Sequence, residues 1–211
     1  MRTDDLIATM AESPWPRLSP ALRVAVALLA GWVVALLGMI LVLGPPLAAV
    51  PATGLLPFTV KTGFTAALTV LSVFAAMAAG RPGQRLATRV ALIAGPFLVL
   101  AALAGLELYS TPPEAWEGLL LGSTSTTCVT AIVLASVPVL ISVLWAYRAF
   151  APTRPVVAGL LAGTSSGAAA AFAYALYCPE TTASFLLASY TPGIALAAAA
   201  GAVLGARLLR W

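Results

Sequence analysis

The sequence predicts an all-α, polytopic membrane protein: a bundle of six transmembrane helices with both termini in the cytoplasm. Hydrophobic residues make up 61% of the 211 positions and charged residues only 9%, whereas about a quarter of the residues in a soluble domain are charged. The few charges leave six long uncharged stretches, each close to the roughly 20 residues that cross a bilayer as a helix. Membrane lipid is therefore the expected surrounding of most of the chain.

The first span is predicted at 24–43, and a signal peptide is the alternative for this stretch. Its apolar run is longer than the roughly 7–15 residues of a signal sequence, which favours a retained helix. The other five spans are predicted between Pro- and Gly-containing connections, which are typical of helix ends. They cover residues 62–80, 89–109, 128–148, 156–177 and 186–206.

The arginines predict the orientation of the bundle. All ten lie before the first span, between the second and third, between the fourth and fifth, or after the sixth, and Lys61 is the eleventh cationic residue. In a six-helix bundle these four regions share one face, which the positive-inside rule places in the cytoplasm. The net charge of +4 is thus a topology signal, and direct binding of nucleic acid is not expected.

The two cysteines are predicted to lie level with each other at the outer face. Cys128 begins the fourth span and Cys178 ends the fifth, and each is 25 residues from Thr153 in the turn between these spans. Equal counts in an antiparallel helical hairpin mean equal height. A disulfide requires Cα atoms within about 4.4–6.8 Å, which only inward-facing positions on neighbouring helices can meet, so the sequence permits a bridge without requiring one.

Two interpretations of the cysteines stay open from position alone. Free cysteine is an ordinary small apolar residue in buried positions, but thiols at a hydrophilic border in an oxidising compartment are reactive. A resident metal site is not expected, because the chain has no histidine and too few ligands for a closed zinc site. A soft metal ion could still bridge the two thiolates transiently.

Glycines repeat every four residues in the last two spans. Gly159, Gly163 and Gly167 form one such stripe, and Gly201 and Gly205 form another. Small residues on one helical face allow close approach of neighbouring helices. We expect these stripes to pack within the bundle, and a homodimer contact is the alternative.

Transport and catalysis are not favoured by the sequence. The predicted span interiors contain no ionisable residue of the kind that marks ion and substrate pathways, with Glu107 placed at the outer border. No nucleophile–base pair, phosphate-binding loop or cofactor motif is present. The chain is therefore not expected to be an enzyme, and no cofactor is predicted.

Residues 1–22 are predicted to form a cytoplasmic docking segment ahead of the transmembrane domain, 23–211. Thr3 is a candidate helix N-cap, and Asp4 and Asp5 fall in the first turn, where the helix dipole favours acidic residues. Leu6 and Ile7 begin an apolar stripe. A helix on the membrane surface usually has a basic polar face, so the acidic face here favours a basic protein partner.

The chain resembles the NrsF family, whose members are bacterial inner-membrane anti-sigma factors, negative regulators of sigma F. The resemblance covers essentially the whole chain and is carried by "RTDDLIATMA", "APTRPVVAGLLAG", "AFAYALYCPE" and "YTPGIALAAAAGAVLGARLLRW".

The resemblance implies a function that the spans alone do not. The chain is expected to sequester an extracytoplasmic-function sigma factor through Asp4, Asp5, Leu6 and Ile7, and to release it under redox or heavy-metal stress. Cys128 and Cys178, which match the two cysteines of the family, would be the sensing pair on the periplasmic side. The alternative is a small transporter or metal exporter with the cysteines as ligands where the substrate enters.

Overall fold

The computed structural model describes residues 19–46, 54–79, 86–150 and 152–210, and this part of the chain is helical with short connections. Six segments are long and apolar enough to cross a membrane, as predicted. The long helices are α2 (Pro20–Leu43), α4 (Leu55–Ala79), α5 (Leu86–Ser110), α7 (Ser125–Tyr147), α8 (Pro155–Ala175) and α10 (Thr191–Leu208). Shorter ones are η1 (Pro113–Ala115), α6 (Trp116–Leu121), η2 (Arg148–Phe150), α9 (Ala183–Phe185) and the π-helix η3 (Leu186–Tyr190).

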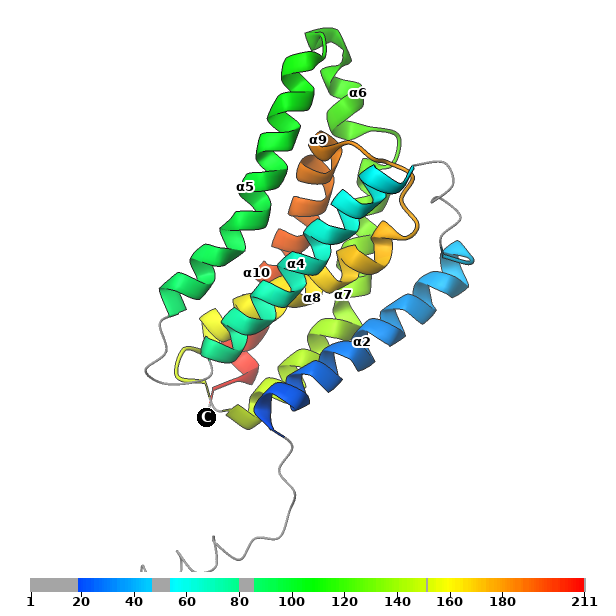
Figure 1. Ribbon diagram of the computed structural model, residues 1–211. Helices are drawn as coiled ribbons and strands as arrows, with labels where there is room; N and C mark the ends of the chain where they lie inside the picture. The colour runs from blue at the N-terminus through cyan, green and yellow to red at the C-terminus, as the bar shows by residue number, and fades with distance from the viewer. Residues whose placement is uncertain (1–18, 47–53, 80–85, 151, 211) are drawn as a thin grey trace, which may run out of the picture.

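Helix α8 lies at the centre of the bundle (Figure 1). It packs against α4, α7, α10 and α2, while α5 lies at one edge against α4 and α9. Most of the α8 side chains are small and buried, which lets four neighbours surround it. Large apolar side chains on the outer helices point away from the bundle, among them Leu41, Leu98 and Trp145. This outward apolar surface is compatible with lipid around the bundle.

The bundle has two chemically different ends. At the arginine end lie Arg23, Arg89, Arg148, Arg154, Arg207 and Arg210, at or near the helix termini gathered at the bottom of Figure 1. At the cysteine end α2, α5 and α8 finish and α4, α7 and α9 begin. The helix order thus separates the described arginines from Cys128 and Cys178, as the sequence predicted.

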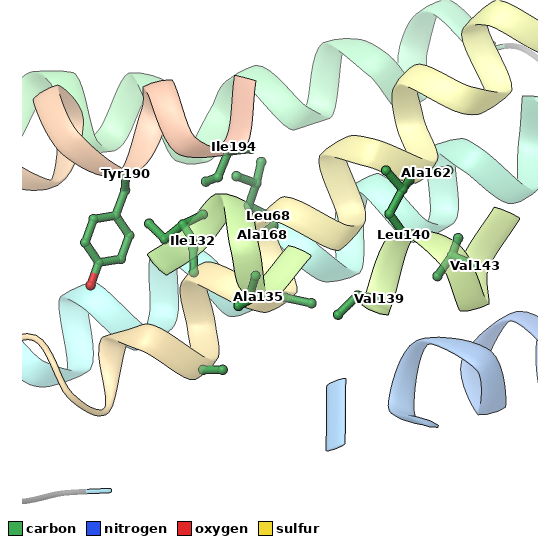
Figure 2. Close-up of a cluster of buried hydrophobic side chains, with 14 of the residues drawn as sticks. Leu68, Ile132, Ala135, Val139, Leu140, Val143, Ala162, Ala168, Tyr190 and Ile194 are labelled. Carbon is green, nitrogen blue, oxygen red and sulfur yellow. The ribbon is translucent and has the colours of Figure 1, made fainter. Parts of the chain in front are cut away.

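The core between the ends is filled by residues from four helices. Leu68 of α4, Ile132 of α7, Ala168 of α8 and Ile194 of α10 meet there (Figure 2). Tyr190, at the end of η3, lies at the side of the same cluster and is completely buried. Cys128 and Cys178 belong to the same cluster of buried residues.

The glycine stripes pack within the bundle, as expected. A Cβ placed on Gly159 would overlap with the carbonyl oxygen of Gly201, and one placed on Gly201 would overlap with that of Gly159. The same holds for Gly163 against the Ala197 carbonyl. The backbones of α8 and α10 are in direct contact here, and a side chain at these positions would force the two helices apart.

One predicted boundary is wrong and matters for the site. The second span was expected to begin at residue 62, after Lys61, but α4 begins at Leu55. Lys61 therefore lies in the second turn of the helix, and it is buried with 1% of its surface exposed. The span interiors thus do contain an ionisable residue, contrary to the sequence-based expectation.

Glycine replacement tests the α8–α10 contact. Gly201→Ala should destabilise the protein by roughly 1–3 kcal/mol, the usual cost of an overpacked core, because its methyl group meets backbone atoms. The same change at Gly38, which has open space around it in α2, should be neutral or stabilising by up to about 1 kcal/mol through helix propensity. Reversible unfolding of the purified protein in detergent measures both, and equal effects at the two positions would contradict the contact.

Candidate functional site: a buried thiol pair

Local sequence brings Cys178 back over the start of α7. Helix α8 ends at Ala175, and the backbone N–H groups of Tyr177 and Cys178 both donate to the Tyr174 carbonyl, forming a tight turn. Pro179 cannot continue a helix, so the chain leaves α8 at this point. Cys128 lies in the first turn of α7, where its N–H donates to the Thr124 carbonyl.

The two cysteines lie at one height, as the residue count predicted, and the structure also brings them together. Their Sγ atoms are 3.7 Å apart, and both side chains are free thiols that are completely buried. The interpretation of a reactive pair assumed that the thiols are open to a hydrophilic border, and the structure shows that they are not. Two thiols at hydrogen-bonding distance can form a disulfide if the sulfurs approach to about 2.05 Å.

Polar groups surround the sulfurs inside this apolar bundle. The Cys128 thiol donates to the Tyr174 hydroxyl at 3.4 Å, and the Thr124 hydroxyl lies 3.6 Å from the same sulfur. The Tyr190 hydroxyl lies near Cys178 and is fully buried, outside hydrogen-bonding geometry. The rings of Tyr174 and Tyr190 are themselves neighbours, with centroids 6.3 Å apart.

Lys61 reaches the pair from α4. Its Nζ donates to the Cys178 carbonyl at 2.7 Å and to the Glu180 carbonyl at 3.3 Å. The two hydrogen bonds join α4 to the segment that follows α8. Lys61 is a site residue that sequence reasoning missed. Its position could have indicated a special role, because it is the single cationic residue predicted on the side of the bundle opposite the arginines.

The environment favours the ionised form of Cys178. Contact with the Cys128 side chain, whose sulfur lies 3.7 Å away, lowers the pKa of the Cys178 thiol most; burial raises it, and the Glu180 backbone N–H and the Lys61 amine lower it further. A thiolate, rather than a thiol, is the reactive form of cysteine. The pair is therefore suited to oxidation or to contact with a soft metal ion.

The π-helix η3 places the last member of this cluster. In Leu186–Tyr190 the wider helical turn joins α9 to α10, and such π segments are frequent at functional sites. Ser189 donates to the Ser125 hydroxyl at 3.0 Å, which fixes η3 against the start of α7. Tyr190 then projects inward next to Cys178.

Two glutamates hold the segments around the pair. The Glu107 carboxylate, in the last turn of α5, accepts from the backbone N–H groups of Ala183 and Ser184, both at 2.8 Å, and from the Ser184 hydroxyl at 2.9 Å. It therefore caps α9 from another helix. The Glu180 carboxylate accepts from the Ser123 N–H and hydroxyl, both at 3.1 Å, and joins the loops before α7 and after α8.

The remaining predicted site residues belong to the N-terminal docking segment. Asp4, Asp5, Leu6 and Ile7 lie outside the described residues. Within the described ranges no group of three or more cysteine or carboxylate side chains could hold a metal ion. The geometry thus offers redox or soft-metal chemistry at two thiols.

Comparison with known proteins covers nearly the whole chain. A family model described as "NrsF: Negative regulator of sigma F" matches residues 9–211. A protein of Azospira oryzae named "Probable anti-sigma-F factor NrsF" is 37% identical over 215 residues, and one of Caulobacter vibrioides named "Anti-sigma-F factor NrsF" is 36% identical over 217 residues. Both alignments cover 100% of this chain and of the relative. No solved structure matches the chain.

Proposed function

Because the chain belongs to the NrsF family of negative regulators of sigma F, which are regulators rather than catalysts, we propose that it retains a sigma factor of the extracytoplasmic-function type at the bacterial inner membrane. Release follows a redox or heavy-metal signal at Cys128 and Cys178. The single observation that carries the sensing role is the 3.7 Å contact between two buried thiols at the end of the bundle opposite the arginines.

The proposed location rests on the surface and the charges of the bundle. Six apolar helices and the outward-facing large side chains suit a lipid environment. The described arginines gather at one end, which by the positive-inside rule is cytoplasmic. The cysteine end then faces the periplasm, where oxidants and metal ions arrive before they reach the cytoplasm.

Docking is assigned to residues 1–22, of which the last three already belong to α2. A short helix with Asp4 and Asp5 on its polar side and Leu6 and Ile7 on its apolar side is marginal alone and gains stability by packing on a partner. Its acidic charge suits a basic groove on a sigma factor. Because α2 begins at Pro20, at the arginine end, this segment emerges on the side where the sigma factor is available.

A signal at the thiols has a short structural route to the arginine end. Cys128 lies in the first turn of α7 and Cys178 just beyond the last turn of α8, and these helices pack side by side and are joined at the arginine end. A change in their packing at one end alters the connection at the other. Moving a partner from about 99% to about 1% bound requires a free-energy difference of about 5.5 kcal/mol between the two states. Forming a disulfide changes stability by up to about 5 kcal/mol, so a thiol switch can supply most of this difference.

Deleting residues 3–12 tests the docking role. A co-expressed cognate sigma factor should co-sediment with membranes that contain the full chain and move to the soluble fraction with the deletion variant. Immunoblots of both proteins in both fractions measure this, with equal membrane levels of the two forms as the control. A small transporter would be indifferent to the deletion, so unchanged retention of the sigma factor would contradict the proposal.

Replacing both cysteines tests the sensing role. The double variant Cys128→Ser/Cys178→Ser cannot form a disulfide or bind a soft metal, so the sigma factor should no longer respond to stress. Transcription from a promoter that depends on the sigma factor is the measurement. Ser165→Ala, at another buried position whose hydroxyl bonds only within α8, is the matched control; normal induction in the double variant would exclude the thiol mechanism.

A further inference from the structure

Lys61 is a buried amine whose hydrogen-bond partners are not carboxylates. The side chain is 1% exposed, and its two hydrogen bonds go to carbonyl oxygens, those of Cys178 and Glu180. Two carbonyl dipoles orient an ammonium group but do not neutralise it. A buried charge without an opposite charge is costly, and in a membrane-spanning helix such a residue points to a functional partner.

Two carboxylates at the cysteine end of the bundle bind other partners. Glu107 is bound to the start of α9, and the Glu180 side chain accepts from Ser123. The ionisable groups that act electrostatically on Lys61 are, in order of strength, Cys178, Cys128 and Glu180. The residue whose backbone carbonyl binds Lys61 most closely, Cys178, therefore also carries the ionisable side chain that acts on it most strongly.

We propose that Lys61 is the counter-ion of a thiolate held by the Cys128–Cys178 pair, and that oxidation of the pair abolishes this ion pair and loosens α4 from the segment after α8. The inference rests on the thiol-sensing role proposed above and gives it a direction. Lys61 acts here as a positioning residue, since it favours the ionised form of Cys178 without itself reacting.

The chemistry requires only an oxidant of the hydroperoxide class. The Cys178 thiolate attacks one oxygen of hydrogen peroxide, which breaks the O–O bond, forms a sulfenic acid and releases hydroxide. The Cys128 sulfur then attacks the sulfenic sulfur; the S–S bond forms, the S–O bond breaks, and water leaves with the Cys128 proton. In sum, one thiolate, one thiol and one peroxide give a disulfide, one water and one hydroxide, and the sulfurs end without charge.

Loss of the thiolate changes the charges that surround the Lys61 amine. The other titratable groups facing the pair are Tyr174 and Tyr190, which are neutral hydroxyls, and Glu180, whose carboxylate is held by Ser123. After oxidation the ammonium group keeps its two carbonyls and the weaker effect of the Glu180 carboxylate but loses the thiolate, so release of a proton or withdrawal of the side chain becomes more favourable. In either case the contact of α4 with residues 178–180 weakens, and α4 runs from this contact to the arginine end. The disulfide form is thus the one that releases the sigma factor.

The pH dependence of thiol reactivity tests the counter-ion role. Purified protein in detergent is alkylated with iodoacetamide across pH 5–10, and the rate at Cys178 is followed by mass spectrometry. Wild type should have a midpoint well below that of an unperturbed cysteine, about 8.5. Lys61→Met should raise the midpoint by about one unit or more, which lowers the rate at neutral pH about tenfold, whereas Lys61→Arg, which keeps the charge, should retain most of the wild-type profile.

Thr65→Val is the matched control. Thr65 is buried one turn further along α4 and its hydroxyl bonds only to backbone carbonyls of its own helix, so this variant should titrate like wild type. Superposable profiles for wild type and Lys61→Met would overturn the proposal. If Lys61→Met does not fold, the wild-type profile decides alone: a midpoint at or above that of free cysteine contradicts a paired thiolate.

Hydrogen exchange tests the release of α4. Amides of residues 55–65 should exchange faster in wild type after peroxide treatment, and oxidation should change little in Lys61→Met, in which the contact is already absent. No change in wild type would overturn the coupling. These measurements do not involve the sigma factor, so they can succeed or fail independently of the retention experiments that test the proposed function.

Discussion

The contact between the Cys128 and Cys178 sulfurs is the feature on which the rest of this structure depends. It lies where α7 begins and α8 has just ended, in a completely buried position that still holds a lysine, two tyrosines and a threonine. Burying polar groups is unfavourable unless they satisfy one another. Their concentration at one end of an otherwise apolar bundle therefore makes this end the candidate functional site.

The surrounding architecture holds this contact in place. Glycine contacts bring α8 and α10 together, and the Glu107 carboxylate fixes the start of α9, so the chain that leaves α8 has little freedom before it re-enters the bundle through η3. Glu180 ties the same segment to the loop before α7. The segments on both sides of Cys178 are therefore bound to neighbouring helices and loops rather than free in a loose loop.

Much of this arrangement could be predicted from the sequence, because it follows from composition and counting. Uncharged stretches predicted six helices, the spacing around Thr153 predicted sulfurs at one height, and the glycine stripes predicted the close helix pair. The contact of Lys61 with Cys178 could not be predicted in this way. A charged residue next to a Pro-rich spacer is typical of a helix boundary, whereas α4 in fact begins six residues earlier, at Leu55. The cap by Glu107 depends on a contact between residues 76 positions apart, and the π segment depends on local packing. Neither leaves a periodic pattern in the sequence.

A redox titration of membranes carrying the bound sigma factor tests the central claim most directly. The membranes are equilibrated in thiol–disulfide buffers of stepped potential, and each sample is divided to measure the Cys128–Cys178 disulfide by mass and the sigma factor left in the pellet. The account predicts that both quantities change together at one midpoint, with the sigma factor lost as the disulfide forms. A sigma factor that stays bound while the pair converts completely would contradict it.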